Sequence, residues 1–385
     1  MNRRAFVVVL DACGVGALPD ADDYGDAGAD TLGHLSRLLE GGLQLPTLEA
    51  LGLGSITTLD GVPPAAEPVL HGRLHALGPG KDSTAGHWEL MGVVAPAPMP
   101  TYPEGFPPAV IDVVTAASGG RGVVCNRPYN GIGAIEDFGA EHVRTGAVIV
   151  YTSEDSVLQI AAHTDVVSEP DLYAICARVR AELPREHTIG RVIARPFTGV
   201  DGSFRRTDGR HDFSVAPPTR SYLEHAQERG VPVHTVGKTN DLFAARGVDV
   251  QHPGATNSVA LAETTELVRT LERGLVFTNL VETDQVYGHR HDAQGFHGAL
   301  REIDSCVAGW LQQLRDRDLL ILTADHGCDI TSPRTDHTRE HVPLLAVFEG
   351  GRGRRHDGPL ADVGASALKW LTGAEVVELP GTPFL

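Results

Sequence analysis

The chain has 385 residues, of which 42% are apolar and 21% charged, and these proportions exclude a disordered, collagen-like or coiled-coil chain. At roughly 100–200 residues per domain, this length accommodates two domains, or one large domain with an insertion. The 50 acidic residues outnumber the 32 basic ones, and the resulting net charge of −18 disfavours nucleic acid and anionic membranes as partners.

The first predicted element is a strand at residues 5–10, an apolar, partly β-branched run that ends at Asp11. The run is too short for the apolar part of a signal peptide, and no segment approaches the roughly 20 apolar residues of a membrane span. The five cysteines include no CxxC pair, which is typical of reduced thiols. We therefore expect a soluble, cytoplasmic protein.

A glycine-rich segment with two hydroxyl side chains follows at residues 78–92. It differs from a phosphate-binding P-loop, because Asp82 stands where Gly-Lys needs Ser or Thr. The alternative is a hydroxyl nucleophile, Ser83 or Thr84, at the start of a helix whose free N–H groups favour a phosphate. A serine that only caps the helix is the competing interpretation.

The middle of the chain, residues 96–218, differs in composition from both flanks. Pro-rich stretches at 95–108 and 214–220 are typical of linkers that leave and rejoin a core. Between them the patterns predict strands at 148–152 and 188–197 and a helix at 169–183. We predict an inserted α+β domain that separates two parts of one core domain, residues 1–95 and 219–385.

The second part of the core alternates helical and strand patterns. Helices are predicted at 221–230 and 297–316, and strands at 231–237, 275–281, 319–324 and 344–348. This alternation predicts an α/β fold with a mostly parallel sheet flanked by helices.

Several predicted strands lead into carboxylate and imidazole side chains, at the sheet edge where α/β proteins place their sites. The candidate ligands are Asp11, Asp284, His289, Asp325, His326 and His337. Mixed oxygen and nitrogen donors suit Zn, Mn, Fe or Mg. They are more numerous than one catalytic ion needs, which favours two ions about 3.5–4 Å apart. A single such Asp is usually a helix cap and a single His a surface residue, so the prediction depends on the combination.

Long blocks of the sequence resemble the phosphopentomutase family of the alkaline phosphatase superfamily. The blocks occur in chain order at residues 10–34, 80–89, 151–163, 190–197, 206–213, 279–290 and 323–345. The resemblance extends over nearly the whole chain. It implies an alkaline phosphatase-like core with the inserted domain as a cap, and a role in nucleoside metabolism.

The resemblance also implies a reaction and a set of site residues. A phosphorylated hydroxyl would exchange phosphate between C1 and C5 of ribose or 2-deoxyribose, after activation by a sugar bisphosphate. Two divalent ions, usually manganese, are implied. Asp11, Asp325 and His326 would hold one ion together with the nucleophile oxygen, and Asp284, His289 and His337 would hold the other. The residues implied to hold sugar and phosphate are Asp155, Arg191, Arg210 and Lys238.

Some segments depart from the family pattern. Ser83 stands where the family usually has Thr, so Thr84 remains a competing nucleophile. Residues 126–139 differ most, and this difference concerns the identity of the sugar more than the reaction type. The alternatives are a mutase of another or a modified sugar phosphate, a metal-dependent phosphatase or phosphoglycerate mutase, and a non-catalytic phosphosugar-binding protein.

Overall fold

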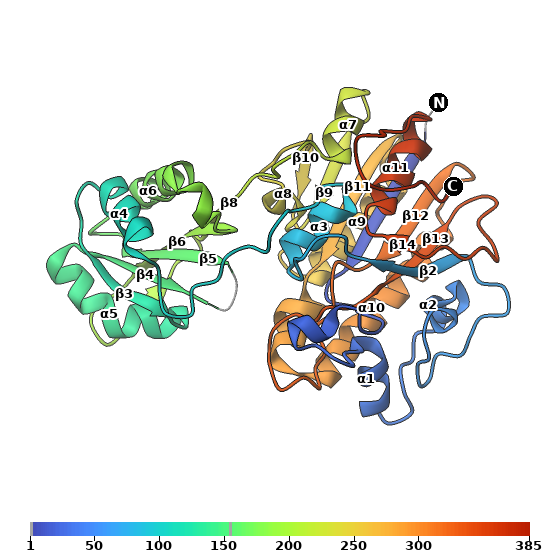
Figure 1. Ribbon diagram of the computed structural model, residues 1–385, viewed down its shortest axis with the longest axis horizontal. Coiled ribbons are helices and arrows are strands. Elements are labelled where there is room, and N and C mark those ends of the chain that lie inside the picture. The colour runs from blue at the N-terminus through green and yellow to red at the C-terminus, as the bar shows by residue number, and fades with distance from the viewer. Residues whose placement is uncertain (1–2, 154–155) are drawn as a thin grey trace. The chain divides into compact units, whose positions relative to one another are not determined.

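The computed structural model describes residues 3–153 and 156–385, and it divides into two compact units that we treat separately (Figure 1). The core unit comprises Met1–Pro98 and Pro217–Leu385, and the insert unit comprises Met99–Ala216. Asp155 lies outside the described residues. Within the described part of the chain, no helix combines the length and apolar character needed to cross a membrane.

The core unit is built on an eight-stranded sheet in the order β10-β9-β11-β1-β12-β13-β2-β14. Neighbouring strands run parallel from β10 to β12, whereas β13 is antiparallel to both β12 and β2, and β14 is parallel to β2. The strands are β1 (Arg4–Leu10), β2 (Leu70–His75), β9 (Val233–Val236), β10 (Val250–His252), β11 (Gly274–Leu280), β12 (Asp318–Thr323), β13 (Val342–Val347) and β14 (Gly358–Pro359). The predicted α/β fold with a mostly parallel sheet is confirmed.

The middle strands are buried along their whole length, as their continuous apolar runs predict. Every residue of β1, β11 and β12 is buried, and each fully buried Val, Leu or Phe contributes about 1.5–3 kcal/mol. One charged side chain, Arg4, is also buried in this core. Its Nε donates to Asp318 Oδ1 at 2.9 Å, and its Nη1 donates to the Val268 carbonyl at 2.6 Å. Each partner thus satisfies the charge of the other.

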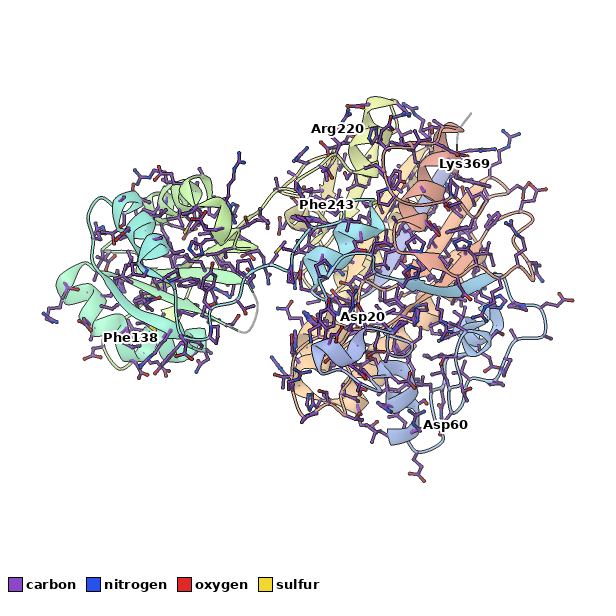
Figure 2. The ribbon with its side chains drawn as sticks, in the orientation of Figure 1. Asp20, Asp60, Phe138, Arg220, Phe243 and Lys369 are labelled. Atoms are coloured by element: carbon purple, nitrogen blue, oxygen red, sulfur yellow. The ribbon has the colours of Figure 1, made fainter. Side chains whose placement is uncertain are left out.

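Helices flank this sheet. They are α1 (Thr31–Leu38), α2 (Pro46–Leu51), α3 (Ser83–Leu90), α7 (Tyr222–Glu228), α8 (Thr239–Leu242), α9 (Asn257–Thr270), α10 (Ala293–Leu311) and α11 (Asp362–Thr372). Short 3₁₀ turns occur at Ala21–Tyr24, Leu53–Ser55 and Gly288–Arg290, and a π turn at Thr283–Tyr287. Beneath the helices, Phe243 and Phe277 form an edge-to-face pair with ring centroids 6.1 Å apart; Figure 2 labels Phe243.

The bounds predicted for the helix at 297–316 lie a few residues too far toward the C-terminus. The helix begins at Ala293 because Asp292 caps it, accepting the Gly295 N–H at 2.9 Å. It ends at Leu311. The helix predicted at 221–230 starts as its capping box requires, with Ser221 and Glu224 each accepting the backbone N–H of the other.

The insert unit contains a mixed sheet in the order β3-β4-β5-β6-β7, with β8 paired to β6. Its strands are β3 (Val123–Pro128), β4 (Val148–Thr152), β5 (Val157–His163), β6 (Arg191–Thr198), β7 (Arg205–Arg206) and β8 (His211–Ser214). Its helices are α4 (Pro108–Ala117), α5 (Gly131–Thr145) and α6 (Glu169–Glu182), with a 3₁₀ turn at Arg185–His187. Helices α4 and α6 pack on one face of the sheet, where Val110, Val114 and Leu172 join one apolar cluster. Helix α5 packs on the other face with Ile135 and Phe197.

Candidate metal centre

Parallel pairing brings the ends of three strands together. Strand β1 lies between β11 and β12, with Leu10 opposite Leu280 and Val9 opposite Thr323. The residues that follow these strands therefore emerge at one edge of the sheet. Asp11, Asp284 and Asp325, far apart in sequence, all lie just beyond this edge.

A first cluster consists of Asp11, Asp325 and His326, all buried. His326 Nε2 lies 3.5 Å from Asp11 Oδ1 and 3.3 Å from Asp325 Oδ2. Two ligands bound about 2.1 Å from one ion at a tetrahedral angle are about 3.4 Å apart. The distances in this cluster thus fit three ligands of one cation.

A second cluster consists of Asp284, His289 and His337. His289 Nε2 lies 3.4 Å from Asp284 Oδ2, and His337 Nε2 lies 3.3 Å from Asp284 Oδ1. The two clusters adjoin, because the ring centroids of His326 and His337 are 4.0 Å apart and Asp284, His326 and His337 also form a compact donor group. The structure therefore brings all the predicted Asp and His ligands together.

The carboxylates of these clusters are short of compensating hydrogen bonds. Asp11 Oδ1, Asp284 Oδ1 and Asp325 Oδ2 are buried and accept no hydrogen bond from the described residues. Burial, reinforced by the charges of Asp325 and Asp284, raises the pKa of Asp11 well above its usual value. A divalent cation would offset both effects, so the donor set fits such an ion.

Hydrogen bonds from outside the clusters orient the ligands. His289 Nδ1 donates to the Thr335 carbonyl at 2.5 Å, and His326 Nδ1 donates to the Gly327 carbonyl at 3.1 Å. Each ring therefore turns its Nε2 toward the neighbouring carboxylates. Asp284 and Cys328 hold the pKa of His289 at about 12, although burial acts in the opposite direction.

Sequence reasoning missed two side chains that support the carboxylates. Asn279 Nδ2 donates to Asp11 Oδ2 at 2.8 Å. His87 Nδ1 lies 3.1 Å from Asp325 Oδ2 and 2.8 Å from the Ser83 carbonyl oxygen. Asn279 had a detectable signal, since it is a polar residue near the end of an apolar strand. His87 had none, because its contact with Asp325 exists only in the folded chain.

The predicted nucleophile Ser83 lies at the first cluster. Asp82 is the residue that caps α3, accepting the Ala85 N–H at 3.0 Å, so the interpretation of Ser83 as a cap is wrong. Ser83 Oγ lies 3.1 Å from His326 Nε2. Thr84 is buried, and on a helix its side chain points about 100° away from that of Ser83. The geometry favours Ser83.

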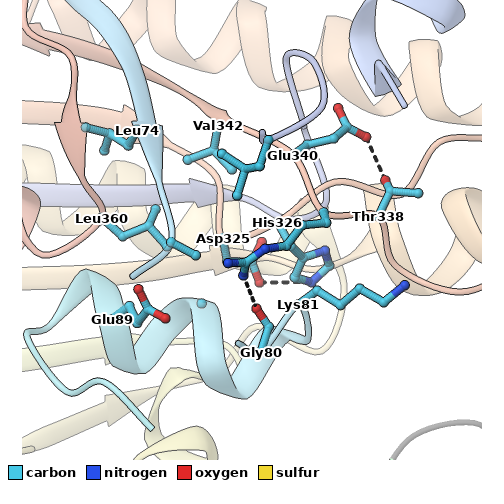
Figure 3. A pocket seen from close by; sticks show the side chains of 14 residues that line it. Leu74, Gly80, Lys81, Glu89, Asp325, His326, Thr338, Glu340, Val342 and Leu360 are labelled. Carbon is cyan, nitrogen blue, oxygen red and sulfur yellow. Dashed lines mark hydrogen bonds and ion pairs between the residues drawn. The ribbon is translucent and has the colours of Figure 1, made fainter. Parts of the chain in front are cut away.

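Figure 3 shows a small pocket that includes His326, the partner of Ser83, and is lined among others by Lys81, Gly86 and Asp325. Gly86 has no room for a side chain, because a Cβ there would lie 2.3 Å from the Asp325 carbonyl oxygen. Helix α3 therefore approaches the first cluster through backbone contact. Arg339 holds the loop before α3, since its Nη1 donates to the Gly80 carbonyl at 2.8 Å.

A buried carboxyl supports the loops around the centre. Glu340 Oε1 accepts the hydroxyl of Thr338 at 2.6 Å (Figure 3). The same oxygen accepts the hydroxyl of Thr31 at 2.6 Å, and Oε2 accepts the Thr31 N–H at 2.9 Å. Burial raises the pKa of Glu340 to about 7. Glu340 thereby connects the start of α1 to the segment that carries His337.

The predicted sugar and phosphate contacts are distributed over both units. Lys238 precedes α8 in the core unit; burial raises the pKa of Asp11, and the Lys238 charge offsets a small part of that rise. Arg191 and Arg210 belong to the insert unit. Arg210 pairs with Asp212 through two hydrogen bonds of 2.7 Å, and Arg191 Nη1 lies 3.7 Å from Asp212 Oδ2. Asp155 lies outside the described residues.

The chain resembles known metalloenzymes in sequence and in fold. The family model of the metalloenzyme superfamily matches residues 3–373. The phosphopentomutase of Anaeromyxobacter dehalogenans is 49% identical over 389 residues, covering 100% of this chain and 99% of that protein. The phosphopentomutase of Carboxydothermus hydrogenoformans is 46% identical over 344 residues, covering 89% of this chain and 88% of that protein. The solved structure of the PH0037 protein of Pyrococcus horikoshii matches 98% of both chains with a TM-score of 0.50 and 13% identity, a likeness of fold alone.

Proposed function

The chain belongs to the phosphopentomutase family of the metalloenzyme superfamily and is an isomerase, and we propose that it moves phosphate between C1 and C5 of ribose or 2-deoxyribose. Its substrate is a small pentose phosphate, and its place of action is the cytoplasm. A sugar bisphosphate, as in the family, would load the first phosphate.

The observation that carries this proposal is the position of Ser83 Oγ, 3.1 Å from His326 Nε2 at the edge of the first cluster. A serine hydroxyl is a weak nucleophile unless a neighbouring base or a cation activates it. Ser83 is the first residue of α3, so N–H groups at the start of that helix favour a phosphate on the hydroxyl. Ser83 therefore suits a side chain that alternately accepts and returns phosphate.

The proposed metal ligands divide into two sets. Asp11, Asp325 and His326, with Ser83 Oγ, would hold one ion, and Asp284, His289 and His337 the other. Bound divalent ions, which we propose to be Mn²⁺, supply positive charge that makes the hydroxyl more acidic and neutralises phosphate oxygens. The chain's own part is positional: Asn279 and His87 hold the carboxylates, and Thr335 holds His289.

We assign the sugar and phosphate contacts to Lys238 in the core unit and to Asp155, Arg191 and Arg210 in the insert unit. The paired donors of an Arg suit two phosphate oxygens. Arg210 already holds Asp212 in this two-bond manner, with both distances at 2.7 Å, so a phosphate would compete with that carboxylate. The inserted segment 96–218 would act as the cap of the family.

Phosphorus NMR tests the reaction directly. The purified protein is mixed with ribose 5-phosphate, Mn²⁺ and a trace of ribose 1,5-bisphosphate. Appearance of the ribose 1-phosphate resonance is expected. Inorganic phosphate as the sole product would indicate a phosphatase instead. An unchanged spectrum would favour a mutase of another sugar phosphate, and 2-deoxyribose 5-phosphate is the next substrate to try.

Two variants test the nucleophile. Ser83→Ala should abolish turnover and phosphate incorporation seen by mass spectrometry, while the protein still binds metal. Thr84→Ala is the matched control, since it removes the neighbouring hydroxyl, and it should retain phosphate incorporation. The reverse pattern would transfer the role to Thr84.

A further inference from the structure

The thiol of Cys328 lies beside the second cluster, and the proposed reaction makes no use of it. Its Sγ, a carboxylate oxygen of Asp284 and a ring nitrogen of His289 all lie within 4.8 Å of one another. Sulfur and nitrogen ligands of one tetrahedral zinc ion are about 3.6 Å apart, since Zn–S is about 2.3 Å and Zn–N about 2.1 Å. The three donors lie at most about 1 Å farther apart than this, so small side-chain movements would bring them onto one ion.

The fold holds this thiol in place from two directions. The Cys328 N–H donates to Thr31 Oγ1 at 3.0 Å, and the side chain is only 1% exposed. On the other side Gly288 leaves room for the sulfur, since a Cβ at that position would lie 3.1 Å from Sγ. Because Gly288 directly precedes His289, the sulfur and the imidazole are held side by side.

An independent observation indicates a cation at this position. Asp284 is 5% exposed, and its Oδ1 accepts no hydrogen bond from any residue that the structure describes. A buried carboxylate oxygen that lacks both a hydrogen bond and a cation is energetically unfavourable. The S–H of Cys328 makes a long contact of 3.9 Å to the Asp336 carbonyl oxygen. Losing this weak hydrogen bond on binding a metal would cost little free energy.

We propose that Cys328 supplies a thiolate to the cation held by Asp284 and His289, and that this sulfur makes the position favour Zn²⁺ or Co²⁺ over Mn²⁺, so that the assignment of Mn²⁺ applies to the ion of the first cluster. The inference rests on the two-metal site of the proposed function. Thiolates are soft ligands that bind zinc and cobalt better than manganese. With His337, the set reaches the four protein donors that zinc takes in closed sites. Binding forms the metal–sulfur bond, breaks the S–H bond and releases one proton to solvent, with no change of oxidation state.

Cobalt is a suitable probe, because a cobalt–thiolate bond gives a charge-transfer band in the near ultraviolet. Metal-free full-length protein is titrated with Co²⁺, and bound cobalt is counted by elemental analysis. The wild-type protein should develop the band, and Cys328→Ala should bind cobalt without it. Cys328→Ser, which keeps the volume beside Gly288, serves if the alanine variant does not fold. Cys13→Ser is the matched control, since Cys13 is also buried and close to a ligand but its Sγ faces the Asp11 carbonyl oxygen at 3.7 Å. It should keep the band.

Competition between Zn²⁺ and Mn²⁺ provides a second measurement. The preference for Zn²⁺ should fall in Cys328→Ser by at least about 10-fold, which is the lower end of what even an outer partner of a metal site contributes. Cobalt bound without the band, or an unchanged preference, would overturn the proposal and leave Cys328 as a space-filling residue. If the wild-type protein bound no cobalt and no manganese at all, the two-metal site itself would fail, and this outcome is distinct from the loss of the sulfur ligand alone.

Discussion

The close approach of helix α3 to Asp325 makes Gly86 a sensitive position for activity. In Gly86→Ala the new methyl group would lie 2.3 Å from the Asp325 carbonyl oxygen and 2.8 Å from the Asp325 Cβ. An ordinary contact between such atoms is about 3.5 Å, so the helix or the strand end must shift by roughly 1 Å. Both neighbours matter, because α3 begins with Ser83 and Asp325 belongs to the first cluster.

A shift of this size separates the nucleophile from the residues that activate it. The contact between Ser83 Oγ and His326 Nε2 is 3.1 Å, so roughly 1 Å more would break it. A misplacement of about 1 Å typically costs about 100-fold in rate, or about 2.7 kcal/mol of transition-state stabilisation. We expect kcat/KM for ribose 1-phosphate formation to fall by about that factor in Gly86→Ala.

The assay compares kcat/KM with the denaturation midpoint of the same preparations. Gly298→Ala is the matched control, because Gly298 is also helical, in α10, and a Cβ there meets nothing within 4 Å. That variant should keep its activity and gain up to about 1 kcal/mol of stability. Wild-type activity in Gly86→Ala would refute the argument that backbone contact between α3 and Asp325 positions Ser83.

Three further outcomes follow from other contacts. Asp318→Asn strands the buried charge of Arg4 and should lower the free energy of unfolding in urea by about 3–5 kcal/mol, whereas breaking the exposed pair of Arg269 with Glu266→Gln should leave that free energy almost unchanged. Because burial raises the pKa of Glu340 from 4.5 to about 7, the folded state keeps a proton that the unfolded chain releases. The free energy of unfolding of metal-free protein should therefore decrease as pH rises between these values. In Glu340→Gln, urea titrations should show a smaller decrease over the same pH range, and an unchanged decrease would contradict the raised pKa of Glu340. Removing divalent ions with EDTA should lower Tm, since an ion at 100 times its Kd contributes about 2.7 kcal/mol, and Asp284→Asn should weaken the recovery that added Mn²⁺ brings.

Much of the local structure could be predicted from the sequence. The apolar runs at 5–10, 275–281 and 319–324 correspond to β1, β11 and β12, because strands buried on both faces need continuous apolar residues. Helix starts were less predictable. The start of α10 depends on the Asp292 cap, which is a single hydrogen bond rather than a repeating pattern.

The supporting parts of the centre were harder to predict. Residues around Asp325 attract attention because Asp-His-Gly follows a strand, but no sequence pattern indicates that His87 contacts Asp325. Cys328 follows that motif directly and still gave no signal. A lone cysteine without a CxxC partner indicates a reduced thiol, and only the folded chain places its sulfur beside His289.

By itself, the sequence of this protein determined the family, the succession of strands and helices, and the kinds of donor atom available to a cation. Those properties depend on residue type and on the spacing of neighbouring residues along the chain, both of which can be read from the sequence. The tertiary structure alone decided that Asp11, Asp284 and Asp325 meet, and that Ser83 faces His326 within 3.1 Å. Distances of that kind arise from strand order and register in the sheet, where β1 pairs with partners some 270 and 314 positions away, and no local pattern encodes such pairings.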